Sequence, residues 1–317
     1  MINHIPEIED ILEAAERIKP YAKRTSVLTC EGLNRLVNAE LFFKCENFQK
    51  VGAFKFRGAT NAVFSLPDEL ARKGVATHSS GNHAAALALA ARNRGIRAYV
   101  VMPYNSPEVK KSAVAGYGAE IIYCEPTLEA RETTLTGVVE KTGATFIHPY
   151  DNYSIIAGQA TAAKELIEEI PNLNIIMAPV GGGGLLSGTA LSTYYFTNGT
   201  IVIAAEPEGA DDAYRSLKEG KIIPSVNPQT IADGLLTSLS EKTFGIISKY
   251  VDRIVTVSED SIISAMRNIW ERMKIIVEPS SAVVFGMLLE DKIDLSGKRI
   301  GMIISGGNVD LQKLPWL

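Results

Sequence analysis

The sequence predicts an α/β protein with two lobes, in which parallel-rich, twisted sheets are flanked by helices. Its 317 residues are too many for one small domain, and 46% of them are hydrophobic, which is enough for a substantial core. From Gly74 onward, short apolar runs alternate with helical patterns, as is typical of parallel strands with covering helices. We expect residues 1–70 and 150–317 to form a large cofactor-binding domain and residues 71–149 a small domain inserted in it.

The pattern of apolar residues gives the individual elements in chain order. In the first half we expect helices over residues 8–18, 32–37, 82–94, 107–116 and 128–142, and strands at 41–43, 75–78, 98–102, 120–123 and 145–147. In the second half we expect helices over 154–169 and 185–196 and strands over 175–180, 201–205 and 299–304, with further strand–helix units between the last two strands. Gly95 stands where a helix C-terminus favours glycine.

Bulk properties exclude several classes of function. The net charge is only −4, so there is no electrostatic case for a nucleic-acid partner or an acidic membrane surface. No apolar run approaches the roughly 18 residues of a membrane span, and the N-terminus lacks a signal-peptide pattern. Cys30, Cys45 and Cys124 are scattered without metal-type spacing, which fits reduced thiols. We therefore expect a cytoplasmic protein.

Lys55 is the strongest candidate for a catalytic residue. A lysine is usually a solvated surface charge, but this one lies in the first turn of an expected helix between Phe54 and Phe56. Apolar neighbours remove water and a helix N-terminus carries partial positive charge, so both predict a lowered pKa. A desolvated amine is what Schiff-base chemistry requires. The same helix should bury Phe54, Ala59, Ala62 and Val63.

Four successive glycines, Gly181 to Gly184, separate a buried strand from a helix. They let backbone N–H groups converge, and the helix N-terminus favours a phosphate; the alternative is an ordinary glycine turn. No Gly-Lys-Ser/Thr follows, which excludes a P-loop, and the glycine spacing fails the dinucleotide fingerprint. Glu206 nevertheless ends the next strand, where a ribose-binding acid belongs. An NAD-dependent or non-catalytic nucleotide-binding protein therefore stays open.

Three further stretches allow either a structural or a functional interpretation. Ser79 to Asn82 can cap a helix with serine or bind a carboxylate at a helix start. The loop Ser305 to Asn308 can be a compact glycine-rich turn or part of a site. The acidic run from Glu206 to Asp212 can be a solvated surface or supply oxygen ligands to Mg²⁺ or Ca²⁺. Glu278 precedes a proline that suits a helix start.

Taken together, these stretches resemble a known family over essentially the whole chain. Residues 47–50 (Asn-Phe-Gln-Lys) and 52–58 (Gly-Ala-Phe-Lys-Phe-Arg-Gly) resemble the cofactor-lysine segment of pyridoxal-phosphate enzymes of the tryptophan-synthase-β type. The similarity is greatest to the serine/threonine dehydratases and serine racemases. It implies the fold-type-II architecture, with pyridoxal 5′-phosphate in the cleft between two lobes.

The resemblance implies a role for each cofactor-site residue. Lys55 holds the cofactor covalently and removes the Cα proton of the substrate. The residues that it implies bind the cofactor are Phe54, Lys55, Asn82, Gly181, Gly182, Gly183, Gly184, Leu185, Gly234, Glu278 and Ser305. Among them the glycines with Leu185 cradle the phosphate, Asn82 contacts the ring hydroxyl and Ser305 partners the pyridine nitrogen. A hydroxyl does not hold that nitrogen protonated, which favours prompt β-elimination over a long-lived carbanion.

The resemblance also implies substrate, metal and effector sites. Ser79, Ser80, Gly81 and Asn82 hold the substrate, with Ser80 facing the reacting carbon opposite Lys55. The ligands implied for a divalent cation, Mg²⁺ or else Ca²⁺ or Mn²⁺, are Glu206, the Ala210 carbonyl and Asp212. Lys50 and Tyr117 match an adenine-nucleotide effector site of some relatives, but Ala85 replaces a glutamine found there, which argues against nucleotide activation. A homodimer is expected by analogy.

Three functions follow from these interpretations. The favoured function is a dehydratase (ammonia-lyase) that eliminates water from L-serine, L-threonine or a 3-hydroxyaspartate and gives a 2-keto acid and ammonia. The second is a serine racemase that interconverts L- and D-serine, with elimination as a side activity and Ser80 as the second base. The third, from a different class, is the nucleotide-binding protein suggested by the glycines and Glu206.

Overall fold

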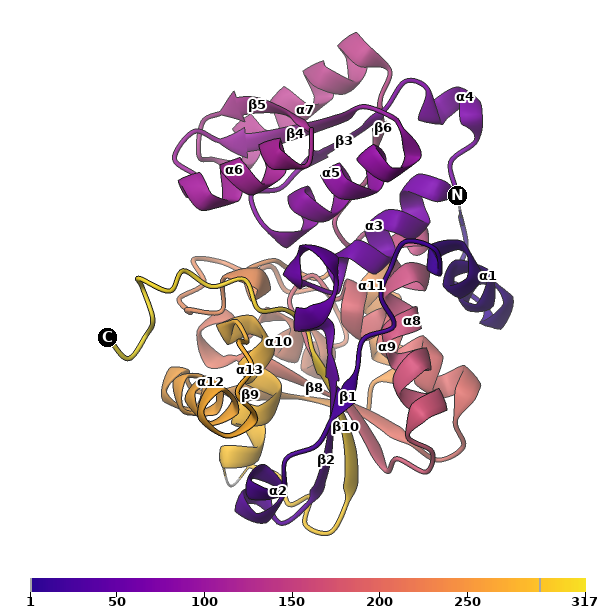
Figure 1. Ribbon diagram of the computed structural model, residues 1–317. Helices are drawn as coiled ribbons and strands as arrows, with labels where there is room; N and C mark the ends of the chain where they lie inside the picture. The colour runs from indigo at the N-terminus through magenta and orange to yellow at the C-terminus, as the bar shows by residue number, and fades with distance from the viewer. Residues whose placement is uncertain (1, 291) are drawn as a thin grey trace.

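Two sheets in separate lobes organise the chain in the computed structural model, which describes residues 2–290 and 292–317 (Figure 1). The larger sheet has the strand order β1-β2-β10-β7-β8-β9, and the smaller has the order β5-β4-β3-β6. Strands β1 and β2 pair antiparallel, and all other named pairs of the described residues are parallel. The expected fold class is confirmed.

The bounds of the elements follow the sequence pattern closely. The strands are β1 Val27–Leu28, β2 Glu40–Cys45, β3 Val75–His78, β4 Ala98–Pro103, β5 Glu120–Cys124, β6 Thr145–Phe146, β7 Ile175–Pro179, β8 Ile201–Pro207, β9 Arg253–Val257 and β10 Arg299–Ile304. The α-helices are α1 Ile8–Ile18, α2 Glu31–Val37, α3 Lys55–Phe64, α4 Asp68–Ala71, α5 Asn82–Arg94, α6 Glu108–Gly116, α7 Leu128–Thr142, α8 Tyr153–Glu169, α9 Gly184–Phe196, α10 Asp212–Glu219, α11 Glu241–Tyr250, α12 Glu259–Met273 and α13 Pro279–Gly286. Within the described part of the chain, none of these helices combines the length and the apolar character that a bilayer crossing demands.

Each expected strand and helix is present, with ends that differ by at most a few residues. The antiparallel strand β1 is an addition, and it is only two residues long, too short for a periodic signal. Strands β3 to β6 form the smaller sheet, and all other strands belong to the larger one. This separation supports the proposed insertion of residues 71–149 into a larger domain, whose boundaries stay a prediction.

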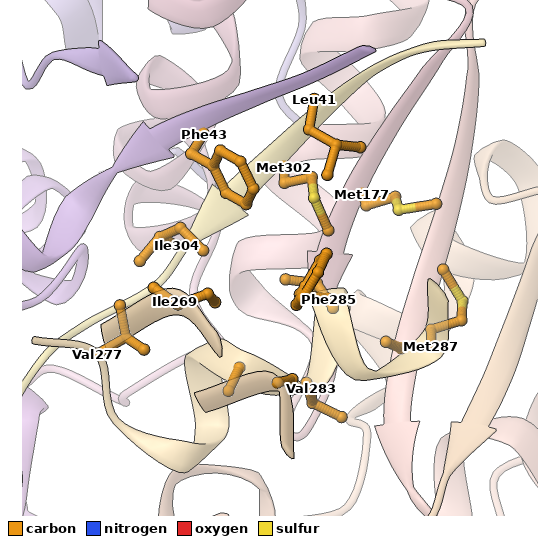
Figure 2. Close-up of a cluster of buried hydrophobic side chains, with 14 of the residues drawn as sticks. Leu41, Phe43, Met177, Ile269, Val277, Val283, Phe285, Met287, Met302 and Ile304 are labelled. Carbon is orange, nitrogen blue, oxygen red and sulfur yellow. The ribbon is translucent and has the colours of Figure 1, made fainter. Parts of the chain in front are cut away.

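The larger sheet is covered by helices on both faces. On one face, side chains such as Leu41, Phe43 and Met302 pack against Phe285 of α13 and Ile269 of α12 (Figure 2). The alternate residues of the strands face α8, α9 and α11 on the other side. Because successive side chains of a strand point to opposite faces, apolar runs without alternation specify such a doubly covered sheet.

Helix α3 lies at the boundary between the two lobes and packs closely on α8 (Figure 1). A Cβ added to Gly158 would lie 2.6 Å from the Cα of Gly58, so the two backbones can approach this closely only because both residues are glycine. Ala59, Ala62 and Val63 are fully buried as expected. Phe54 is only partly buried, which corrects the expectation, because it precedes the first turn of the helix instead of lying within its buried face.

A buried ionic cluster fixes α3 to the larger lobe. The guanidinium of Arg57, fully buried, donates from Nε to Glu46 at 2.7 Å and from Nη2 to Glu165 of α8 at 2.8 Å. Lys44 of β2 pairs with the same Glu165 at 2.6 Å. Desolvation alone would lower the pKa of Arg57, but the two carboxylates outweigh it and raise that pKa, so Arg57 stays charged.

This cluster leads to a prediction for Arg57→Ala. The substitution leaves Glu46 buried without its cation, so we expect the free energy of unfolding to fall by about 3–5 kcal/mol. Urea-induced unfolding measures the change. The matched control is Arg35→Ala. The Arg35 side chain is 73% accessible, so its ion pair with Glu31 should contribute less than about 1 kcal/mol to the free energy of unfolding. Equal losses in the two variants would contradict the assigned role of Arg57.

Candidate active site

Lys55 is the first residue of α3, and its amine lies against the chain that follows the smaller sheet. Nζ donates a hydrogen bond to the Pro149 carbonyl at 3.1 Å and lies 5.1 Å from the centre of the Phe54 ring. Desolvation lowers the pKa of Lys55 to about 8, and the attraction of Glu278 opposes that shift in part. The direction expected from the sequence is therefore correct, with burial as its main cause.

The loop after β10 positions the residue before Lys55. The carbonyl of Ser305 accepts a hydrogen bond from the Phe54 N–H at 2.9 Å, and Ala53 forms a β-bridge with Gly306. The Ser305 hydroxyl is buried and lies 2.9 Å from that of Ser281 in α13. The structure thus brings Ser305 to the start of α3, and its hydroxyl is held by another hydroxyl instead of a carboxylate.

A polar network joins the two lobes beside this loop. Asn82, at the start of α5, donates from Nδ2 to Glu278 at 3.1 Å. Asn308 donates from its backbone N–H to Glu278 at 3.1 Å and from Nδ2 to the Asn82 oxygen at 2.8 Å. Desolvation and, after it, the nearby Asp233 carboxylate raise the pKa of Glu278 to about 7, although the hydrogen bond from Asn82 acts against the shift. Asn82 and Glu278, 196 positions apart in sequence, are thereby in direct contact.

The glycine loop between β7 and α9 is packed too tightly for any side chain. A Cβ on Gly182 would lie 2.4 Å from the Tyr150 ring, and Gly183 has φ of +83°, which favours glycine. In the described residues, the backbone N–H groups from Gly181 to Leu185 donate to no other protein atom. The loop therefore presents free donors at the N-terminus of a helix, as an anion requires. Gly234 lies beside it, since its carbonyl is 3.3 Å from the Cβ position of Gly181.

The loop from Ser79 to Gly81 joins β3 to α5. The N-cap of α5 is Gly81, and no side chain caps it, so helix capping by serine does not explain this motif. Ser79 accepts a hydrogen bond from the Gly81 N–H at 3.4 Å. Ser80 is partly exposed in the same loop, and in the described structure no hydrogen bond ties its hydroxyl to Lys55.

The acidic run after β8 is largely buried, so a solvated surface is the wrong interpretation for Glu206 and Asp212. Glu206 accepts hydrogen bonds from the backbone N–H groups of Ala213 at 2.9 Å and Tyr214 at 2.7 Å, in the first turn of α10. Desolvation raises the pKa of Glu206 to about 9 and that of Asp212 to about 6. Both carboxylate oxygens of Asp212 are buried and bond to no atom of the described residues. Ala210 lies in the turn between them, over Glu208–Ala210.

This geometry also removes the case for a ribose-binding acid. A residue that binds a ribose must present its carboxylate to the ligand, whereas Glu206 is fully buried and already bonded to two amides. Across residues 2–290 and 292–317, no three His, Cys, Asp or Glu side chains are grouped for a metal ion. The cation site expected from the sequence needs only two carboxylates and a carbonyl, so this finding does not test it.

Three residues of the site carried no sequence assignment. Asn308 closes the network between Asn82 and Glu278, Tyr150 packs on the glycine loop, and His148 lies with its ring centre 4.6 Å from that of Tyr150. Asn308 ends a glycine-rich loop, and this loop is a sequence signal that could have identified it. Tyr150 and His148 stand in an irregular segment without periodicity, so only their spatial neighbours reveal them.

The donor set fits an aldehyde cofactor that carries a phosphate. An amine with a lowered pKa suits a carbonyl group, free amides at a helix N-terminus suit a phosphate, and Asn82 and Ser305 offer polar groups for a heteroaromatic ring. A nicotinamide dinucleotide would instead need an available acid after β8, which the buried Glu206 does not provide.

Comparisons with known proteins agree with this geometry. Residues 18–306 match the family model described as pyridoxal-phosphate dependent enzyme. The chain is 53% identical over 313 residues to beta-hydroxyaspartate dehydratase of Paracoccus denitrificans, covering 99% of both chains. It is 46% identical to L-threo-3-hydroxyaspartate ammonia-lyase of Saccharomyces cerevisiae, covering 99% of this chain and 96% of that one. The crystal structure of serine racemase from Dictyostelium discoideum superimposes with a TM-score of 0.92 at 50% identity, covering 96% and 99% of the two chains.

These matches extend over nearly the full length of the chain and include every stretch that forms the site. They exclude the nucleotide-binding alternative, and they show that the protein is an enzyme with the fold-type-II architecture. The chain belongs to the family of pyridoxal-phosphate dependent enzymes.

Proposed function

We propose that this enzyme eliminates water from a β-hydroxy amino acid and gives a 2-keto acid and ammonia. The observation that carries the proposal is the Lys55 amine, which is bonded to the Pro149 carbonyl at 3.1 Å beside Tyr150, the residue packed on the glycine loop at the start of α9. Burial lowers the pKa of this amine to about 8. Among the candidate substrates we favour a 3-hydroxyaspartate over L-serine and L-threonine, since two extensive similarities are to enzymes named for it. A homodimer is part of the proposal by analogy with the family.

The cofactor supplies an electron sink when it is bound, and the residues of the chain do the rest. The amine of Lys55 holds the cofactor and, once released by the incoming substrate, accepts the Cα proton. Gly181 to Leu185 hold the phosphate through their amides, and the start of α5 at Ser79 to Asn82 holds the substrate carboxylate. Phe54 and Gly234 would lie beside the bound cofactor. The Ser305 hydroxyl, bonded to Ser281, leaves the ring nitrogen unprotonated, which favours elimination.

A second candidate function is racemisation of serine. It is supported by the likeness to a serine racemase over 96% of the chain and by the partly exposed hydroxyl of Ser80 in the substrate loop. If Ser80 gives a proton to the face of Cα opposite Lys55, the substrate is inverted; if the hydroxyl leaves first, the product is a keto acid.

We also propose that a divalent cation, Mg²⁺ in the first place, binds between β8 and α10. Its ligands are Glu206, the Ala210 carbonyl and Asp212, with waters completing the shell. Two buried carboxylates with raised pKa values, one of them without a bonding partner in the described residues, are costly unless a cation neutralises them. Such an ion organises the larger lobe and takes no part in bond breaking.

The Lys55→Ala variant tests the dehydratase. We expect it to lose the absorption band of lysine-bound cofactor and about 10³-fold or more of its turnover with L-serine, L-threonine and L-threo-3-hydroxyaspartate, because both the covalent anchor and the base are gone. Chiral chromatography of keto acid and D-isomer measures the products. Lys19→Ala, at the exposed residue that follows α1, is the control that should retain activity. Retained turnover in Lys55→Ala would contradict the role of Lys55 as cofactor anchor and base.

Ser80→Ala separates the two candidate reactions. We expect formation of D-serine from L-serine to fall by about 10²-fold or more, while keto acid still forms from the L-substrate, because only inversion needs a proton donor on the second face. The same chromatographic assay measures both products. Equal loss of both activities would argue against the two-base model.

Asp212→Asn tests the cation. Wild-type protein should gain about 2.7 kcal/mol of stability when Mg²⁺ is present at about 100 times its Kd, and lose it again with a chelator. Asp212→Asn should lose this gain while its metal-free form is no less stable than wild type, because a buried charge has been removed. Thermal unfolding with and without Mg²⁺ measures both effects, and Glu208→Gln at an exposed position is the control. An identical Mg²⁺ effect in Asp212→Asn would exclude the site.

A further inference from the structure

His148 holds a fixed tautomer in the segment between β6 and α8. Its Nδ1 accepts hydrogen bonds from two backbone N–H groups, those of Asp151 at 2.8 Å and Tyr150 at 3.3 Å. A ring nitrogen that accepts in this way carries no proton, so the single proton of the neutral ring must be on Nε2. The turn from Pro149 to Asp151 therefore sets the direction in which His148 can donate.

The surroundings of His148 keep the ring neutral. Its ring is edge-on to those of Tyr150, Phe146 and His78, at centre distances of 4.6, 5.6 and 6.3 Å. Desolvation lowers the pKa of His148 to about 4; the carboxylate of Asp151 acts against this, and His78, Lys55 and Lys242 act with it. Near neutral pH the imidazole is an uncharged donor.

The Nε2–H of His148 has no partner in the described structure. Nε2 bonds to no atom of residues 2–290 and 292–317. It is also not one of the buried polar atoms that lack a partner, so solvent can reach it. His83 differs from His148, because its Nε2 is bonded to the Ile147 carbonyl at 3.1 Å and its Nδ1 is buried without a partner in the described residues. Of these two rings, that of His148 therefore combines a set tautomer with a donor that a ligand can reach.

The segment that carries His148 also contacts Lys55, which points to the substrate as a partner for this donor. The carbonyl of the next residue, Pro149, is the one that accepts the Lys55 amine at 3.1 Å. Because Lys55 must reach the Cα proton, a bound substrate lies close to this segment of the chain, which carries His148 one residue before Pro149. A neutral N–H suits the lone pair of an oxygen at that place.

We propose that the Nε2–H of His148 donates a hydrogen bond to the oxygen on Cβ of the substrate and stabilises it as it leaves. The inference rests on the proposed elimination and assigns the residue that recognises the leaving group. It also supplies a preference for β-hydroxy substrates, since a bound substrate without that oxygen displaces water from the Nε2–H and offers it no acceptor.

The elimination step balances with His148 as a donor that keeps its proton. Lys55 takes the Cα proton, the electron pair of the Cα–H bond forms a Cα=Cβ double bond, and the Cβ–O bond breaks with its pair on oxygen. The leaving oxygen then takes a proton from the Lys55 ammonium and departs as water. A neutral imidazole is too weak an acid to give up its proton here, so its contribution is to hold and polarise the oxygen.

Two substitutions and two substrates test the proposal on the holoenzyme. In His148→Asn the amide oxygen can still accept from Tyr150 and Asp151, but the Nε2 donor is lost; in His148→Gln an amide N–H returns near the Nε2 position. We expect His148→Asn to lower kcat/KM for L-serine or L-threo-3-hydroxyaspartate by about 10- to 100-fold. The same variant should change kcat/KM for β-chloro-L-alanine by less than about 3-fold, because chloride leaves without such a hydrogen bond. His148→Gln should recover part of the loss.

A spectroscopic measurement gives a readout that does not depend on turnover. In wild-type holoenzyme labelled with nitrogen-15 at histidine, Nε2 of His148 should be protonated and Nδ1 unprotonated. Malate, which resembles 3-hydroxyaspartate without its amine, should shift the Nε2–H resonance, whereas succinate, which lacks the hydroxyl, should not.

The outcomes separate the two proposals. If wild type eliminates water from no β-hydroxy amino acid, the proposed function fails. If wild type is active but His148→Asn lowers the rates for L-serine and β-chloro-L-alanine equally, His148 has only a structural role. A proton on Nδ1, or equal shifts with malate and succinate, would likewise overturn the proposal.

Discussion

The buried pairing of Arg57 with Glu46 and Glu165 is the interaction on which the rest of the site depends. Residues two apart on a helix differ by about 200° in direction, so Arg57 and Lys55 point to opposite sides of α3. The guanidinium is bonded on the side of β2 and α8, and the amine is thereby directed toward the second lobe. A charge that cannot leave its partners without a large desolvation cost therefore fixes the rotation of the helix that carries the proposed catalytic lysine.

Helix α3 is also held at its start by the loop that follows β10. The hydrogen bond from Phe54 to the Ser305 carbonyl ties the residue before Lys55 to the loop after β10. From that loop, Asn308 reaches Glu278 and Asn82 and so connects the larger lobe with the N-terminus of α5. The start of α3, Glu278, Asn308 and the start of α5 are consequently parts of one hydrogen-bonded system that spans both lobes.

Several residues at the site serve structure and chemistry at once. Gly182 admits the Tyr150 ring and also leaves its amide without a protein partner in the described residues. Glu206, near the end of β8, accepts hydrogen bonds from the first turn of α10 and is also one of the proposed cation ligands. His148 binds two amides of its own turn through Nδ1 and keeps Nε2 free. In each case the structural contact sets the orientation in which the remaining polar group is available. A structural role for a residue is therefore no argument against a functional one.

The sequence by itself determined the α/β class, nearly all the elements and the lysine, glycine-loop and serine-loop positions. These features depend on local periodicity and on the special conformations that glycine allows, both of which are written in neighbouring residues. Only the tertiary structure decided that Glu206 and Asp212 are buried, that Phe54 is only partly buried, and that Asn308, Tyr150 and His148 lie at the candidate site. Burial, pairing and tautomer depend on groups far apart in the chain, as the contact of Asn82 with Glu278 across 196 positions shows, and no local pattern encodes them.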